Sequence, residues 1–291
     1  MSDASSSHVL TNELLGPLCP LTVEDRASVS DEVARIPRVL ADFAVPRPGG
    51  GSFRLTDHDI RTALASPDHT VDATPFAWSA RTARRALGLS AVRSLVAGDS
   101  RSPIEGVRAT IADTVRSSRQ GERPDSPMDR WLAGLPAAGL SVVQSEAVTW
   151  ATRLWCALDW SAFEDRPVIG RDHWWDSPHS SLLAIRSRAE VRSVGFDREG
   201  HPFSVHLVVL AGPRRSTVRS ELSVVAMVEA LHAARSLSPG RVLGWWPDSG
   251  HLVKVEVDQR AVAAGVEAVA RTLARVGGTG VPFEGAARVA V

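Results

Sequence analysis

The sequence predicts an α/β protein in which a helical N-terminal part precedes a mixed sheet flanked by helices. Apolar residues recur at helical spacing through the middle of the chain, up to about residue 160. From residue 180 the pattern changes to two strand-like stretches, and helical patterns follow between and after strands. We therefore expect a flexible N-terminal segment over 1–50, a helical region over 51–160 and an α/β region over 161–291.

Capping residues mark the helices expected in the first half. Thr56-Asp57-His58-Asp59 opens a short helix, and a longer helix is expected from Ser79 to Ala97, ending at Gly98. Ser102-Pro103-Ile104-Glu105 is a capping box with proline at the first helical position. Residues 141–160 carry a further amphipathic pattern, so we expect a helix there too.

The second half begins with two expected strands. Residues 182–196 alternate apolar and polar side chains, which is typical of a strand with one buried face. After a turn at 197–200, the nearly continuous apolar run 203–210 is typical of a central strand. We expect these strands to be antiparallel neighbours, with a helix over 217–235 packed on their sheet. The remaining elements are expected as strands at 241–246 and 252–257 and a helix at 259–276.

Composition restricts the classes of protein that remain. The net charge is zero, with 33 basic and 33 acidic residues, so only a local basic patch can attract nucleic acid. Cys19 and Cys156 form no disulfide framework, which fits a cytoplasmic protein, and Cys156 lies in an apolar helical run that predicts a buried thiol. We find neither a signal peptide nor about 18 uninterrupted apolar residues, and expect no membrane partner.

Four motifs of the second half follow one another in a meaningful order. They are Arg188-Ala189-Glu190-Val191 on the first strand, Val208-Val209-Leu210-Ala211-Gly212 on the second, Glu221-Leu222 on the helix, and the hairpin from Val242-Leu243-Gly244-Trp245-Trp246 to Lys254-Val255-Glu256-Val257. The order resembles the core of the PD-(D/E)XK nuclease superfamily, RecB-type branch, over about a third of the chain. This resemblance implies a restriction-endonuclease-like fold and an ancestral metal-dependent cleavage of DNA.

The chain departs from that family at the catalytic positions. Setting Gly212 on the family glycine places Val208 at the metal-binding acid and Leu210 at the lysine. Neither side chain can hold a metal or stabilise developing charge. Glu190 remains, but Arg188 and Arg192 flank it, so an ion pair is expected rather than a metal ligand. We expect no metal site and no cofactor.

Five arginines form the candidate nucleic-acid surface. Arg186, Arg188 and Arg192 share the polar face of the first strand and are expected to be an exposed ridge. Arg214 and Arg215 precede a helix N-terminus, where free N–H groups favour anions. Such a surface can hold phosphates without cutting them. The alternative is a solvated polar face balanced by Glu190, Glu199 and Glu221.

Other candidate residues have simpler structural interpretations. Asp172, Asp176 and His179 could meet as metal ligands, but their spacing matches no strong metal signature, and a loop packed by tryptophans is expected instead. Of the neighbours Trp245 and Trp246, one is expected in the core, and at most the other is free to stack on a base. His206, in the apolar strand, is expected to be a core histidine with its hydrogen bonds satisfied.

The leading hypothesis is a catalytically degenerate PD-(D/E)XK-like protein that binds nucleic acid or serves as an assembly subunit, with DNA or a protein as its partner. One alternative is an active DNA nuclease whose ligands have migrated, with Glu190 and Glu221 as catalytic residues, Glu146 as a third ligand and Mg²⁺ as cofactor. The other is a protein-interaction module without nucleic acid.

Overall fold

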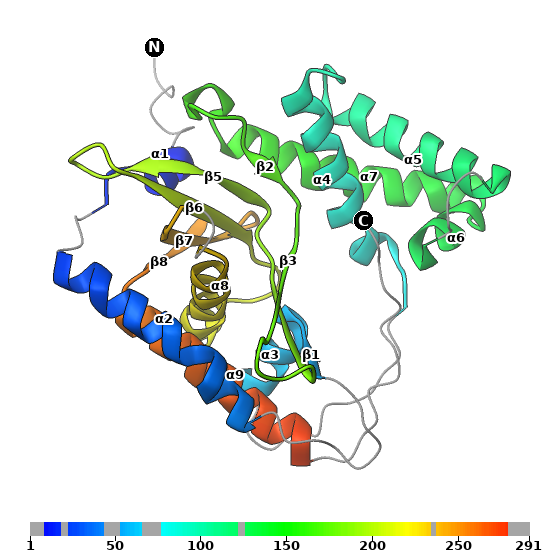
Figure 1. Cartoon of the computed structure of the whole chain (residues 1–291). Helices are drawn as coiled ribbons and strands as arrows, with labels where there is room; N and C mark the ends of the chain where they lie inside the picture. Colours follow the sequence, from blue (N-terminus) through cyan, green and yellow to red (C-terminus); the bar gives the residue numbers. More distant parts are fainter. Residues whose placement is uncertain are drawn as a thin grey trace. The chain divides into compact units, whose positions relative to one another are not determined.

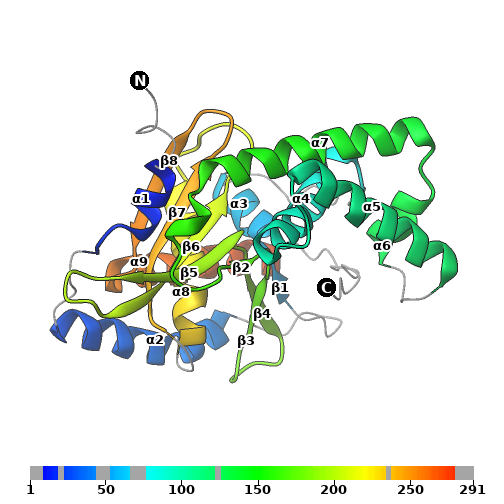
Figure 2. The same ribbon diagram turned by 90° about the horizontal axis from the view of Figure 1, so that it is seen from above.

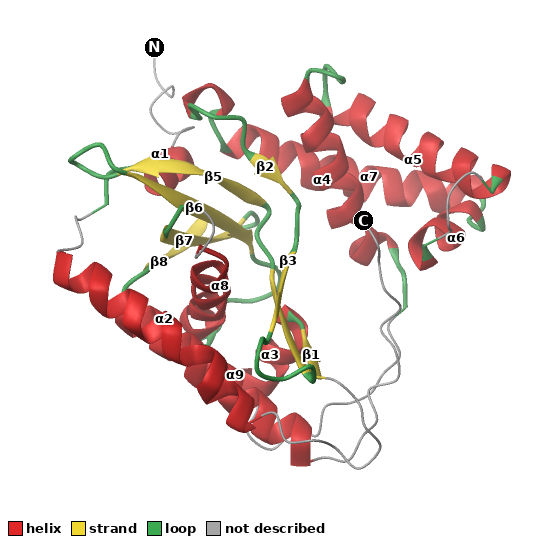
Figure 3. Ribbon diagram, in the orientation of Figure 1, coloured by secondary structure: helices red, strands yellow, loops and turns green. Residues whose placement is uncertain are grey.

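The computed structural model describes residues 9–18, 23–43, 53–65, 77–121, 126–233 and 237–278 (Figure 1). The predicted class is confirmed: the protein is α/β, with mixed sheets flanked by helices and a helical N-terminal part (Figure 3). Contacts divide the chain into two units. Unit 1 comprises Met1–Leu10, Thr74–Gly170 and Glu284–Val291, and unit 2 comprises Thr11–Ala73 and Arg171–Phe283.

Unit 1 is built from helices whose ends follow the capping residues. Its elements are α4 (Ala80–Ala97), α5 (Pro103–Gln120), α6 (Pro127–Ala133), α7 (Ala137–Ala157), the 3-10 turn η1 (Trp160–Ala162) and the short strand β2 (Val168–Ile169). Ser79 and Thr82 form a reciprocal capping box on α4, and Gly98 ends that helix in the left-handed region at φ +82°. At α5 the Ser102 hydroxyl accepts from the Glu105 N–H as expected, whereas the Glu105 carboxylate accepts from the Arg101 N–H.

One side chain of unit 1 corrects the sequence analysis. Cys156 was expected to be buried, but it is exposed in the last turn of α7. The buried stripe of α7 runs through Val143, Ala147, Ala151 and Leu154, and Cys156 lies two residues beyond it. Two residues are about 200° of helix rotation, so the thiol points away from that stripe.

The mixed sheet of unit 2 contains the strands β5 (Val191–Phe196), β6 (Pro202–Val209), β7 (Pro239–Trp246) and β8 (His251–Glu256), which are neighbours in that order. β5 and β6 are antiparallel, β6 and β7 parallel, and β7 and β8 antiparallel. The helix α8 (Val218–His232) lies in the connection between the parallel strands β6 and β7, and it packs against β7 and β8. The expected antiparallel pairing is therefore confirmed for residues 191–196 of the first predicted strand, and the expected helix on this sheet is confirmed.

A second sheet corrects the expected strand 182–196. The chain breaks at 188–190 into β4 (Leu183–Ser187) and β5, which belong to different sheets. β4 lies between β1 (Phe53–Leu55), which is parallel to it, and β3 (His173–Asp176), which is antiparallel to it. Four of the five β4 residues are buried, so this strand is covered on both faces rather than on one.

Helix α8 lies at the centre of unit 2, between the mixed sheet and the helices α2 (Val23–Phe43) and α9 (Gln259–Gly278) (Figure 2). The short α3 (Asp57–Ala65) packs against α9, and α1 (Val9–Leu15) ends near β7. No helix is predicted from the sequence before residue 50, yet α1 and α2 lie there. Pro37 inside α2 is a residue that argues against a helix, so this one was missed.

The core of unit 2 joins these layers. Its fully buried side chains include Leu40, Ile185, Leu222, Met227, Val242 and Leu273. Among the described residues, no helix is long and apolar enough to span a bilayer.

Candidate functional site

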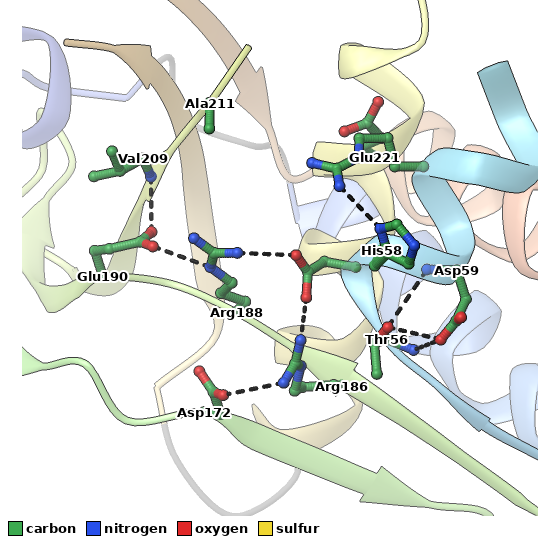
Figure 4. A network of polar contacts seen from close by, with 12 residues as sticks. Thr56, His58, Asp59, Asp172, Arg186, Arg188, Glu190, Val209, Ala211 and Glu221 are labelled. Carbon is green, nitrogen blue, oxygen red and sulfur yellow. Dashed lines mark hydrogen bonds and ion pairs between the residues drawn. The ribbon is translucent and has the colours of Figure 1, made fainter. Parts of the chain in front are cut away.

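The candidate site is a network of arginines and carboxylates at the ends of β4 and β6 and the starts of α3 and α8 (Figure 4). It is centred on a cavity of about 60 Å³. On this scale one water needs roughly 10–15 Å³, so the cavity has room for a few waters or a small anion. Its charged lining residues are Asp57, Arg61, Arg186, Arg188, Arg215 and Glu221.

Glu190 supports the backbone beside this cavity. The carboxylate has no exposed surface; one oxygen accepts from Arg188 Nε at 3.1 Å, and the other accepts from the Val209 N–H at 2.7 Å. β5 begins at Val191, whose partner on β6 is Leu207, so Val209 lies beyond the end of the pairing. The Glu190 side chain thus takes the place of the missing strand and satisfies a buried donor.

Asp57, the first residue of α3, connects Arg186 of β4 with Arg188, which follows the last residue of that strand. One carboxylate oxygen accepts from Arg186 Nη2 and the other from Arg188 Nη1 at 3.0 Å. Asp172 lies on the other side of Arg186, 3.6 Å from Nη1. Burial would lower the pKa of the Arg188 guanidinium, but the carboxylates of Glu190 and Asp57 raise it above its ordinary value.

A further ion pair closes the cavity at the start of α8. Arg215 binds Glu221 through both arms of its guanidinium, with Nε–Oε1 at 2.7 Å and Nη2–Oε2 at 2.5 Å. The Thr217 hydroxyl donates to the same carboxylate at 2.8 Å. Arg214, by contrast, is exposed. Both oxygens of Glu221 are therefore already engaged by donors from its own chain.

The apolar wall of the cavity includes Val208 and Leu210, which the structure places beside Arg188 and Glu221. Both are also members of the core cluster. The two positions at which the resemblance requires an acid and a lysine thus present only methyl groups to the cavity.

The expected exposed ridge of arginines is wrong. Arg192 is buried and bound to Glu229, and the side chains of Arg186 and Arg188 are only about a quarter exposed, at 25% and 24%. The expectation rested on one continuous strand, whereas the break at 188–190 sends these side chains to different surroundings. Of the five arginines, Arg186, Arg188 and Arg215 meet at the cavity.

Arg192 belongs to a second polar cluster that surrounds Glu229 of α8. Glu229 Oε1 accepts from Ser187 Oγ at 2.5 Å and from Arg192 Nη2 at 2.7 Å. Its Oε2 lies 3.0 Å from His173 Nδ1 and 3.9 Å from His206 Nδ1. A single buried carboxylate on α8 therefore connects β3, β4, β5 and β6.

Burial and charge shift the pKa values of this second cluster. Burial would raise the pKa of Glu229, but the hydrogen bond with His173 and the charges of His206 and Arg192 lower it well below its usual range. Burial lowers the pKa of His206 to about 4, with Glu229 opposing and Arg192 reinforcing the shift. Burial also lowers the pKa of His232, whose ring packs against His173.

The remaining predicted ligands do not assemble. Glu146 lies in unit 1, where it pairs with Arg84 at 3.0 Å. Over the described residues, one group of at least three metal-ligating side chains comes together, formed by Asp197, Glu199 and His201 on the β5–β6 turn. Among the described residues, Asp172, Asp176 and His179 form no such group, and the loop expected there is wrong in part, because His173–Asp176 is the strand β3.

The aromatic candidates lie inside the protein. Trp245 and Trp246 are both buried, which corrects the expectation that one of them can be free to stack on a base. β7 has every residue buried, so its two faces are covered alike. His206 is a core histidine as expected, with Nε2 3.0 Å from Ser204 Oγ, but its Nδ1 makes no hydrogen bond.

Two carboxylates that organise these clusters, Glu229 and Asp57, are not among the residues predicted from the sequence. Glu229 follows Leu222 by seven residues and Val225 by four, so it falls on the buried stripe of α8, and this position was a readable signal. Asp57 was noted only as part of a helix start. Its pairing with arginines about 130 residues later is a tertiary contact that local patterns do not show.

Comparison of the chain with models of protein families and with curated proteins finds no match.

Proposed function

We propose that this protein binds without cutting: it acts as a catalytically degenerate PD-(D/E)XK-like subunit that contacts the phosphate groups of DNA or assembles with a protein partner. The observation that carries the proposal is the cavity at the start of α8, where Val208 and Leu210 stand among arginines. We further infer a cytoplasmic location from the small number of cysteines.

The engaged state of the carboxylates argues against metal-dependent cleavage. A magnesium site needs carboxylate oxygens that are free to bind the ion. Glu190 uses one oxygen on Arg188 and the other on the Val209 N–H, and Glu221 uses both on Arg215. Binding a metal here would require these buried ion pairs to break, which leaves uncompensated guanidinium groups.

The same guanidinium groups support phosphate binding. Arginine presents a planar fork of donors that suits phosphate as well as carboxylate. Arg186, Arg188 and Arg215 meet at one cavity, and Arg214, the residue before Arg215, adds an exposed charge shortly before the start of α8. Because each phosphate that an arginine neutralises releases condensed counterions from the DNA, binding should weaken as the salt concentration rises.

A salt titration tests the DNA contact. We expect the log of the affinity for one oligonucleotide to fall by roughly 0.7–0.9 per phosphate for each tenfold rise in salt. Replacing Arg214 and Arg215 by alanine should flatten this slope by one to two phosphates' worth, about 0.7–1.8. The matched control is the alanine double variant of Arg116 and Arg119, two exposed arginines of α5 in unit 1, which should keep the wild-type slope.

Three outcomes decide between the hypotheses. Equal slopes in the Arg214/Arg215 variant and the wild type would exclude this surface as the DNA contact. No binding even at low salt would favour the protein-interaction module. Degradation of DNA with Mg²⁺ or Mn²⁺ that disappears in Glu190→Ala would support the nuclease with migrated ligands instead.

A further inference from the structure

We propose that Asp57 occupies an oxyanion site between Arg186 and Arg188, so that the carboxylate and a phosphate group compete for the same two guanidinium groups. The inference deepens the proposed function, since it concerns the regulation and ligand class of the same arginines. It predicts that the site is held closed by the protein's own side chain and opens when Asp57 is neutralised or displaced.

The geometry of Asp57 is that of a bridging ligand. Its two carboxylate oxygens do not share one arginine; one accepts from Arg186 and the other from Arg188 (Figure 4). A phosphate group bridges two guanidinium groups in the same way, through separate oxygens. The cavity of about 60 Å³ opens beside this bridge, with Arg61 and Arg215 also in its lining.

The charges around the cavity favour an anion once Asp57 is neutralised. The network has four guanidinium groups, on Arg61, Arg186, Arg188 and Arg215. Four carboxylates, on Asp57, Asp172, Glu190 and Glu221, form ion pairs with Arg186, Arg188 or Arg215, and a fifth, on Asp59, accepts from Thr56. Neutralising Asp57 removes the negative charge that lies between Arg186 and Arg188, in a partly buried site where Coulomb interactions are weakly screened.

The start of α3 does not prevent this test. Thr56 and Asp59 form its cap: the Thr56 N–H and hydroxyl both donate to Asp59 Oδ2 at 2.7 Å. These bonds are retained when Asp57 becomes asparagine, which has nearly the same shape. The Asp57 side chain itself is 30% exposed, so the substitution is at the margin of the fold rather than in its core.

The experiment measures binding of inorganic phosphate by calorimetry at low ionic strength to three proteins: wild type, Asp57→Asn and Asp113→Asn. Asp113 forms an exposed ion pair with Arg116 on α5, so its substitution makes the same change of net charge elsewhere. We expect Asp57→Asn to bind phosphate at least about tenfold more tightly than wild type, because the competing carboxylate is gone. Asp113→Asn should match the wild type, and Arg188→Gln added to Asp57→Asn should remove the gain.

Oligonucleotides with and without a 5′-phosphate distinguish a terminal phosphate from a backbone phosphate as the source of the oxyanion. If Asp57→Asn binds free phosphate more tightly than wild type but no variant binds DNA, the proposed contact with DNA is wrong and the oxyanion site is supported. Equal phosphate affinities of wild type and Asp57→Asn would overturn the inference, whatever DNA does. Should Asp57→Asn be poorly folded, phosphate should raise its melting temperature more than that of the wild type; an equal shift would also overturn it.

Discussion

Lowering the pH from 7 to 5 should destabilise the protein through His206, a buried imidazole of the Glu229 cluster. Only 2% of the residue is exposed, and burial lowers its pKa from 6.5 to about 4. The unfolded chain therefore takes up a proton at a pH where the folded protein does not. Stability is fully present above the unfolded pKa and is lost as the pH falls below it, until the folded pKa is reached.

The expected size follows from the two pKa values. Because the pKa of His206 falls from 6.5 in the unfolded chain to about 4 in the folded protein, the loss is limited to about 3 kcal/mol, of which about 2 kcal/mol has been lost at pH 5. His232, whose pKa is also lowered by burial, adds to the loss in the same direction. The pKa of Glu229 is lowered too, but a carboxylate of this kind loses its contribution only below about pH 4.5, so it has little effect at pH 5.

Urea unfolding followed by tryptophan fluorescence at pH 7, 6 and 5 measures this loss. The variant His206→Gln keeps a polar amide near Ser204 but does not titrate, so its stability should fall by about 2 kcal/mol less than that of the wild type between pH 7 and 5. The control is Val142→Gln, an exposed change on α7 that introduces the same amide and no titratable group, so it should show the wild-type pH dependence. The same pH dependence in wild type and His206→Gln would refute the assignment of acid sensitivity to this buried imidazole.

Two further predictions concern buried polar groups of unit 2. Glu190→Ala should lower the free energy of unfolding in urea by about 3 kcal/mol, because it leaves the Val209 N–H without its acceptor and removes a partner from Arg188. Glu190→Gln keeps an acceptor and should lower the free energy of unfolding less. Equal losses in the two variants would contradict this role of Glu190. Arg241 is buried and donates to the carbonyls of Glu13, Leu14 and Gly16 at the end of α1. Arg241→Met should therefore speed the hydrogen exchange of backbone amides in α1 far more than in α8. Unchanged exchange in α1 would show that other contacts hold this helix.

Sequence patterns were sufficient where the structure depends on neighbouring residues. The ends of α4, the turn between β5 and β6, and the positions of α8 and α9 follow from capping residues, turn residues and apolar spacing. Each of these features is set by interactions over a few residues. The apolar residues at positions 208 and 210 could likewise be read directly, and the structure places both Val208 and Leu210 in the lining of the cavity.

Only the tertiary structure decided what surrounds the charged residues. Alternation over 182–196 is compatible with one strand or with two, and the break at 188–190, which puts β4 and β5 in different sheets, leaves no trace in that pattern. A period of two residues records which side chains alternate, but not which sheet or helix covers each face. The burial of Arg192 against Glu229 and the bridging of Arg186 and Arg188 by Asp57 arise from contacts between elements distant in the chain, so they appear only when the chain is folded.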